Sequence, residues 1–224
     1  MKASHAYKPH ASRSYIWRGG LSALGLIGFA LLAEEAREGG VNPLDQLVLS
    51  VLHTPMGGSD MPPWVQVLTR DITALGGFTI LAVVSVFATT MMLIYHQRRY
   101  AAVFALTVVM AQATTEGLKT LIARPRPRLL SHADIVYSSS FPSGHATMAT
   151  VVYLALAVIL CRALQRSGAR ALALGTAIGL ILAIGITRIE LGVHWPTDVL
   201  AGWLLGSAIA VTAVTVAGPT SPTL

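Results

Sequence analysis

The chain has 224 residues, of which 54% are hydrophobic and only 12% are charged. This balance is too apolar for an ordinary soluble domain of this length, so it predicts an integral membrane protein. The formal net charge of +6 does not indicate a nucleic-acid partner, because the basic residues are divided among short polar segments and form no stripe that alternates with aromatic residues.

Six apolar segments are long enough to cross a bilayer, whose apolar core of about 30 Å requires roughly 20 helical residues. The expected fold is therefore all-α: a polytopic membrane protein with one domain at 1–218 and a disordered tail at 219–224. The six transmembrane helices are predicted, in chain order, at Tyr15–Ala33, Phe78–Tyr95, Tyr100–Leu118, Ala146–Leu164, Ala171–Thr187 and Pro196–Ala217.

The distribution of basic residues predicts the orientation, because Lys and Arg concentrate in cytoplasmic segments. Cytoplasmic N- and C-termini in a plasma (inner) membrane would place the following basic residues inside: Lys2, Lys8, Arg13, Arg18, Arg98, Arg99, Arg162, Arg166 and Arg170. The opposite side still carries Lys119, Arg124, Arg126, Arg128 and Arg188. Because these residues run against the topological rule, we interpret them as part of an anion site.

The longest polar segment, Glu34–Gly77, separates the first two predicted spans and contains amphipathic patterns at Pro43–His53 and Pro63–Ile72. Short helices lying in the outer membrane interface would give this pattern. A solvated loop is an equally good interpretation of the pattern alone.

Paired glycines occur in the last two predicted spans, Gly175 with Gly179 and Gly202 with Gly206. Small residues at this spacing let helix backbones approach closely in membranes. We therefore expect the fifth and sixth spans to pack tightly against each other.

A first polar cluster lies at the end of the third span, where Lys119 is followed by Arg124-Pro125-Arg126-Pro127. The two X-Pro steps end the helix and hold the chain extended, so Lys119 and Arg126 can converge on one anion. Basic side chains reaching toward the membrane interface are the alternative interpretation. Glu116 precedes Lys119 by three residues, and we expect a salt bridge between them rather than a contact with substrate.

A second cluster, Pro142-Ser143-Gly144-His145, leads into the fourth span. Serine is a favoured N-cap, and a helix N-terminus offers unpaired N–H groups to an anion. Gly144 lets the backbone come close to such an anion. Taken alone, this tetrapeptide would more often mark an ordinary capped helix start.

A third cluster, containing Arg188, His194 and Asp198, joins the last two spans. A helix that begins near Pro196 would bring the Asp198 carboxylate within reach of the His194 imidazole. Such a partner fixes the tautomer and raises the basicity of a histidine, which leaves the other ring nitrogen as a nucleophile. A buried structural His–Asp pair is the alternative.

Together the three clusters resemble the signature of the type 2 phosphatidic acid phosphatase superfamily of integral membrane lipid phosphatases. Its first motif, Lys, six residues and Arg-Pro, matches Lys119 to Arg126-Pro127, and Pro-Ser-Gly-His matches Pro142 to His145. The third motif matches at Arg188, His194 and Asp198, although Thr187 stands where the family usually has Ser.

The resemblance implies a phosphatase without metal or cofactor that acts on a lipid phosphate at the extracytoplasmic (periplasmic) face. It implies that His194 forms a phosphohistidine, His145 protonates the departing oxygen and Asp198 orients His194. The phosphate would be held by Lys119, Arg126, Ser143, Gly144 and Arg188.

The sequence leaves the lipid open among undecaprenyl diphosphate, phosphatidylglycerophosphate and phosphatidic acid types, and it leaves the oligomeric state open. We assign head-group choice to Glu34–Gly77 and to Arg124, Arg128 and His132. A phosphotransferase would use the same motifs. A transporter would instead place ionisable residues near the bilayer midplane, whereas those in this chain gather at one face.

Overall fold

The computed structural model describes residues 10–38, 42–53, 62–127 and 138–218. The predicted tail at 219–224 lies outside these residues, as do Arg128 and His132. The described elements are helical, which confirms the all-α fold. In chain order they are α1 (His10–Arg37), α2 (Pro43–His53), α3 (Pro63–Ala74), α4 (Phe78–Ile94), α5 (Arg98–Ile122), α6 (Gly144–Ala149), the π-helical segment η2 (Thr150–Leu154), α7 (Ala155–Ala163), α8 (Ser167–Glu190) and α9 (Pro196–Ala217).

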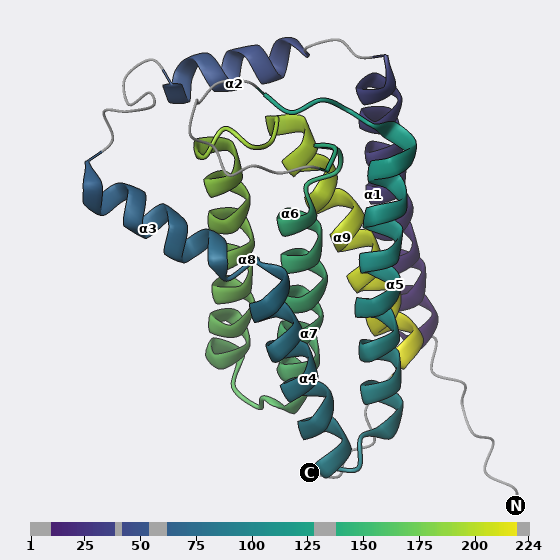
Figure 1. Ribbon diagram of the computed structural model, residues 1–224. Helices are drawn as coiled ribbons and strands as arrows, with labels where there is room; N and C mark the ends of the chain where they lie inside the picture. Colours follow the sequence, from purple (N-terminus) through teal and green to yellow (C-terminus); the bar gives the residue numbers. More distant parts are fainter. Residues whose placement is uncertain (1–9, 39–41, 54–61, 128–137, 219–224) are drawn as a thin grey trace, which may run out of the picture.

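The long helices run side by side as a bundle (Figure 1). Within the described residues, five helical segments are long and apolar enough to cross a membrane: Ile16–Arg37, Arg98–Ile122, Gly144–Ala163, Ser167–Glu190 and Pro196–Ala217. The second predicted span is α4, which has only 17 residues and follows α3 through a bend of 43°. Counted as one bent unit, α3 and α4 supply the sixth candidate span.

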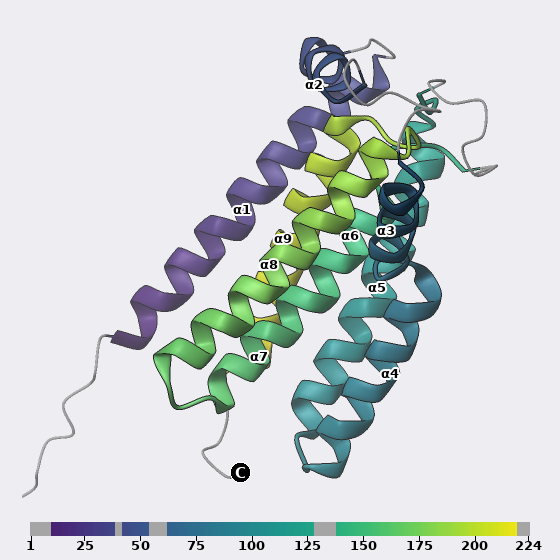
Figure 2. The ribbon, with the colours of Figure 1, turned by 90° about the vertical axis from the view of Figure 1, so that its left-hand side faces the viewer.

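The amphipathic patterns between the first two spans are both helices, α2 over the predicted range and α3 two residues longer than predicted. Helix α2 lies across one end of the bundle (Figure 1, Figure 2). It buries Asp45 and Leu49 against the protein, while Leu44, Leu47 and Val51 are exposed. This outward apolar face is what an interfacial helix requires. The glycine-rich residues at 57–60 lie outside the described part of the chain.

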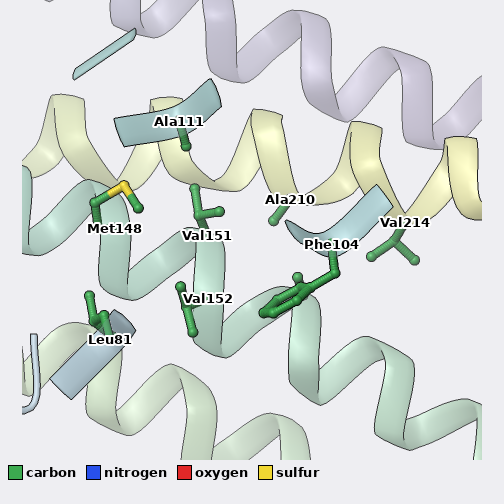
Figure 3. Close-up of a cluster of buried hydrophobic side chains, with 9 residues drawn as sticks. Leu81, Phe104, Ala111, Met148, Val151, Val152, Ala210 and Val214 are labelled. Atoms are coloured by element: carbon green, nitrogen blue, oxygen red, sulfur yellow. The ribbon is translucent and has the colours of Figure 1, made fainter. Parts of the chain in front are cut away.

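A core of buried apolar side chains joins α4, α5, α6, η2, α7 and α9 at the centre of the bundle (Figure 3). Its buried members are Leu81, Phe104, Ala111, Met148, Val151, Val152, Ala155, Ala210 and Val214. Burying apolar side chains at close packing fixes the relative positions of these helices. The helix ends that carry the polar motifs are thereby held at fixed positions relative to one another.

The prediction that paired glycines join the fifth and sixth spans was wrong. A Cβ at Gly202 would lie 2.9 Å from the Cβ of Ala146, and a Cβ at Gly206 would lie 2.7 Å from the carbonyl oxygen of Thr147. These two glycines of α9 therefore allow close packing against α6, the start of the fourth span. Spacing shows that two glycines share a helix face, but it does not show which helix lies opposite.

The glycine pair of α8 faces away from the bundle. Within the described residues, no atom other than neighbouring backbone lies within 4 Å of a Cβ built at Gly175 or Gly179. The close approach between α8 and α9 occurs at Gly185, where a Cβ would overlap the indole ring of Trp203. Trp203 also donates a hydrogen bond from Nε1 to the carbonyl oxygen of Ile181, 3.2 Å away.

Candidate active site

The three polar clusters meet at the end of the bundle that α2 crosses, where α5 and α8 end and α6 and α9 begin (Figure 1). Lys119, Arg126, Arg188 and His194 all lie close enough to His145 for their charges to act on its imidazole. Residues that are distant along the chain therefore share one electrostatic environment.

Asp198 is placed beside His194 by the first turn of α9. One carboxylate oxygen, Oδ2, accepts a hydrogen bond from the backbone N–H of Trp195 at 2.8 Å, as in a capping box. The same oxygen lies 3.5 Å from Nδ1 of His194. Nδ1 is buried and has no hydrogen-bond partner among the described residues, so the two groups are in ion-pair range but slightly too far apart for a good hydrogen bond.

Arg126 lies on the other side of the same imidazole. Its Nη1 is 3.2 Å from Nε2 of His194. A guanidinium has only donors, so Nε2 must accept, and the proton of the neutral ring is then on Nδ1, facing Asp198. Nε2 consequently carries the lone pair that a nucleophile needs.

The guanidinium of Arg126 is also held by backbone. Its Nε donates to the carbonyl oxygen of Ser138 at 2.9 Å, its Nη1 to that of Val193 at 2.6 Å, and its Nη2 to that of Ser139 at 3.2 Å. These contacts fix the direction of the side chain near the start of the segment that follows α5. A fixed cation is what binding of a phosphate requires.

Burial decides the charge of His194. Desolvation lowers the pKa of the imidazole to about 4, although Asp198 acts in the opposite direction and raises it; Arg126 and Arg188 lower it further. Asp198 therefore affects the pKa in the predicted direction, but its contribution is outweighed. The imidazole is neutral at physiological pH.

Lys119 and Glu116 form the predicted salt bridge, with Nζ 3.0 Å from Oε1. The lysine amine also lies directly over the start of α6, because a Cβ built at Gly144 would be only 3.2 Å from Nζ. The absence of a side chain at Gly144 thus lets the amine approach the helix N-terminus. The approach to Gly144 places the positive charge of Lys119 beside His145, while Glu116 holds the amine from its other side.

Ser143 links two helix starts. Its backbone N–H donates to the carbonyl oxygen of Asp198 at 3.0 Å, and its hydroxyl accepts from the N–H of Ala146 at 3.5 Å, as an N-cap. The residue is completely buried. Its backbone N–H and its hydroxyl oxygen thus make contacts inside the protein, and binding of phosphate by Ser143 stays a prediction.

An apolar cavity of about 720 Å³ lies between α4 and α5 and reaches the polar site. Lys119, Gly144 and His145 line its polar end. Apolar side chains such as Leu81, Val86 and Val109 line most of the remainder, and Gln112 and Glu116 also reach it. Val86 and Val109 are also exposed at the surface, so the cavity opens onto the apolar flank of the bundle.

Among the described residues, no group of three or more His, Cys, Asp or Glu side chains is arranged to hold a metal ion. Positive charge around the two histidines comes from Lys119, Arg126 and Arg188.

Comparison with known proteins identifies this arrangement. The profile of the PAP2 superfamily matches residues 100–220, which contain all three polar clusters. The chain belongs to the PAP2 superfamily. It is a phosphatase that hydrolyses phosphate esters, as its named relatives are. The family resemblance seen in the sequence is thereby confirmed.

Several PAP2 relatives resemble the chain over much of its length. It is 33% identical to phosphatidylglycerophosphatase B of Bacillus subtilis over 147 residues, 64% of this chain and 71% of the relative. It is 31% identical to an undecaprenyl-diphosphatase of Sulfolobus acidocaldarius, covering 56% of this chain and 60% of that protein. The crystal structure of a transmembrane PAP2-type phosphatidylglycerolphosphate phosphatase from Bacillus subtilis superposes with a TM-score of 0.73 at 27% identity, covering 86% of this chain and 93% of that one.

Asp45 lies before the segment that the PAP2 profile matches, and sequence reasoning missed it. Its carboxylate is fully buried, with Oδ2 2.8 Å from Nη2 of Arg124, and Nη1 of Arg124 is 2.6 Å from Oδ1 of Asp198. Arg124 is therefore occupied inside the protein, which argues against its predicted part in head-group choice. The available signal was weak: one acidic residue in an amphipathic pattern.

The bend between α3 and α4 also contributes to the site. Nη1 of Arg188 donates to Oγ1 of Thr73 at 2.9 Å. At the bend itself, a Cβ built at Gly76 would overlap the side chain of Ile184 and lie 3.4 Å from Cδ2 of His145. The bend thus packs against the second histidine, and the overlap with Ile184 is what requires glycine at position 76.

Proposed function

We propose that this PAP2 phosphatase hydrolyses a lipid phosphate through a phosphohistidine on His194. The observation that carries the proposal is the apolar cavity ending at Lys119, Gly144 and His145. Pockets that hold an apolar ligand are lined mainly by apolar groups, with a few polar groups that fix its orientation. Such a cavity accommodates a lipid chain while its phosphate reaches the two histidines.

In the first step, Nε2 of His194 attacks phosphorus and the bond from phosphorus to the lipid oxygen breaks. His145 donates its proton to that departing oxygen. Lys119, Arg126 and Arg188 bind the equatorial oxygens, where charge is concentrated during phosphoryl transfer. Arg126 exchanges its hydrogen bond to Nε2 for one to the phosphoryl group.

In the second step, His145 accepts a proton from water, and the water oxygen attacks the phosphorus of the phosphohistidine. The phosphorus–nitrogen bond breaks, inorganic phosphate leaves, and His194 regains its neutral form. The partner at Nδ1 is the carboxylate of Asp198, 3.5 Å away, which stabilises the ring while it is phosphorylated.

The substrate class we propose is a lipid whose phosphate is terminal: a phosphatidylglycerophosphate-type or phosphatidic acid-type monoester, or a polyprenyl diphosphate. Relatives are named for the first and the last of these chemistries. All present a phosphoryl group at the end of a long apolar chain, which matches the cavity beside the site.

We further propose a plasma (inner) membrane location with the active site on the extracytoplasmic (periplasmic) side. The start of α1 and the end of α9 lie at the end of the bundle opposite the site (Figure 1). The same end holds the α4–α5 and α7–α8 connections, and the basic residues in these connections and in the adjoining helix turns are Arg98, Arg99, Arg162, Arg166 and Arg170. Basic residues mark the cytoplasmic side.

The test is phosphate release by purified protein in detergent with excess chelator, from lipid monoesters and a polyprenyl diphosphate. We expect turnover of at least one lipid, an acid-labile phosphoenzyme, and a loss of more than about a hundredfold in His194→Ala. The variant must elute from size exclusion like the parent. Activity retained in that variant, or label passed to a second lipid instead of water, would contradict the proposal.

A further inference from the structure

Three buried charged side chains connect α2 to the proposed nucleophile. Asp45 and Asp198 are fully buried, and Arg124 between them is 4% exposed. Burying a charge costs several kcal/mol unless it is paired and its hydrogen bonds are satisfied. Here the pairing is close, at 2.8 Å to Asp45 and 2.6 Å to Asp198.

Asp45 also caps the helix that carries Asp198. Its Oδ1 accepts from the backbone N–H of Thr197 at 2.8 Å, and its Oδ2 accepts from the Thr197 hydroxyl at 2.8 Å. That hydroxyl in turn accepts from Nη1 of Arg124 at 2.8 Å. The carboxylate thus compensates an N–H group in the first turn of α9, where negative charge is favourable.

Arg124 divides its donors between the two carboxylates. Its Nη1 is directed at Oδ1 of Asp198, which leaves Oδ2 for Trp195 N–H and for His194. If the guanidinium shifted, the Asp198 carboxylate would be free to rotate and the 3.5 Å approach to Nδ1 would be lost. The far side of the guanidinium is fixed by Asp45.

We infer that Asp45 is a positioning residue for His194, acting through Arg124 and Asp198. This inference rests on the proposed roles of His194 and Asp198. It makes α2, whose outer face is apolar, a part of the active-site scaffold.

The test compares Asp45→Asn with Leu49→Ala. Asn keeps the shape of the side chain, but its amide group must place a donor against Arg124 or Thr197. We expect kcat to fall on the order of tenfold to a hundredfold, the range seen when supporting partners of a functional group are lost, with KM within about threefold.

The control variant is Leu49→Ala. Leu49 is buried on the same face of α2, against Ala146, Ile189 and Val199, so Leu49→Ala loosens α2 without touching the charges. Its kcat should stay within about threefold of the parent.

A double variant separates positioning from a general loss of structure. If Asp45 acts only through Arg124, then Asp45→Asn combined with Arg124→Gln should have the same kcat as Arg124→Gln alone, within about twofold. If the two substitutions acted independently, their fold losses in kcat would multiply instead.

If Asp45→Asn does not fold, Thr197→Val provides the second test, because it removes the bridging hydroxyl and keeps both carboxylates. We expect kcat of this variant to fall by about threefold to tenfold with KM unchanged.

Three outcomes would overturn the inference: full kcat in folded Asp45→Asn, equal losses in Asp45→Asn and Leu49→Ala, or multiplicative losses in the double variant. If Asp45→Asn does not fold, unchanged kcat in Thr197→Val has the same meaning. His194→Ala is measured in parallel. If that variant remains active, the proposed function fails; if it is inactive while Asp45→Asn is fully active, only the inference fails.

Discussion

Nη1 of Arg126 lies 3.2 Å from Nε2 of His194 and donates to it. The arginine that we assign to the phosphate therefore occupies the lone pair of the proposed nucleophile. This contact selects the reactive tautomer in advance, because a guanidinium cannot accept a hydrogen bond. An arriving phosphate competes for the same donor, so binding of the anion and exposure of the lone pair occur together.

The lowered pKa of His194 predicts that the rate of the reaction falls only at a much lower pH than it would with an ordinary histidine as the nucleophile. Only the neutral ring attacks phosphorus, and with a pKa of about 4 the ring stays neutral until the pH falls through that value. In a His145→Ala background with p-nitrophenyl phosphate, the pH dependence of kcat/KM should report His194 once the ionisation of the substrate's own phosphate, measured separately, has been divided out. We expect a plateau from pH 7 to about 5. A half-maximal rate near pH 6.5, the ordinary value, would contradict the assignment.

The same pKa has a consequence for stability. The native state binds the proton more weakly than the unfolded chain, in which a histidine has a pKa near 6.5. The contribution of His194 to the free energy of unfolding is therefore complete above pH 6.5 and is lost as the pH falls toward 4. Thermal unfolding in detergent should show a midpoint that rises with pH over this interval, and less so in His194→Ala.

His145→Ala should be most damaging with poor leaving groups. An alkyl oxygen requires protonation as it departs, whereas p-nitrophenolate leaves without it. We expect the loss in kcat to be at least about tenfold larger for an alkyl phosphate than for p-nitrophenyl phosphate. Single-turnover measurements of phosphoenzyme formation with both substrates provide the test. Equal losses would remove His145 from the role of acid.

Gly144→Ala should weaken phosphate binding. The new Cβ would stand 3.2 Å from Nζ of Lys119, so the amine must move away from the start of α6. We expect inorganic phosphate to inhibit the variant several-fold less strongly, at about a tenfold lower kcat/KM. Gly117→Ala is the matched control on α5, because its added Cβ meets open space. Equal inhibition of the Gly144→Ala variant and the parent would contradict this role.

Filling the cavity should discriminate between long and short substrates. Ala82 lines the cavity on α4, whereas the neighbouring Val83 is exposed on the outer face of the same helix. We expect Ala82→Phe to lower kcat/KM for a long-chain lipid phosphate by about tenfold and to leave p-nitrophenyl phosphate within about twofold. Val83→Phe should change neither. Similar losses on both substrates in Ala82→Phe would indicate a distorted site instead of a blocked lipid path.

Apolar length and local spacing made much of the fold predictable. The last span begins at Pro196 and ends at Ala217 as predicted, because a proline at the first helical position marks the start clearly. The helical spacing of Glu116 and Lys119 likewise predicted their salt bridge. Both results depend on residues that are near each other in the chain.

Relationships between distant residues could not be predicted in the same way. Asp45 and Arg124 are 79 residues apart, and nothing in either local pattern shows that α2 folds back over the site. Gly202 was correctly interpreted as a close-packing residue, but the partner helix was wrong. Ser143 matched its motif, yet only the structure shows that its N–H is used by Asp198.

The hydrogen bond from Ser143 N–H to the carbonyl oxygen of Asp198 joins the N-cap of the helix that carries His145 to the helix that carries Asp198. A tilt of either helix is therefore transmitted to the other, and the spacing of the two imidazoles is preserved during thermal motion of the bundle. Arg126 belongs to the same assembly, because its Nη1 donates to the carbonyl oxygen of Val193 and to Nε2 of His194, whereas Lys119 approaches from α5 and pairs with Glu116. The two imidazoles and Arg126 are thus tied to the same stretch of backbone, while the flexible side chain of Lys119 is left to adjust to phosphates of different bulk.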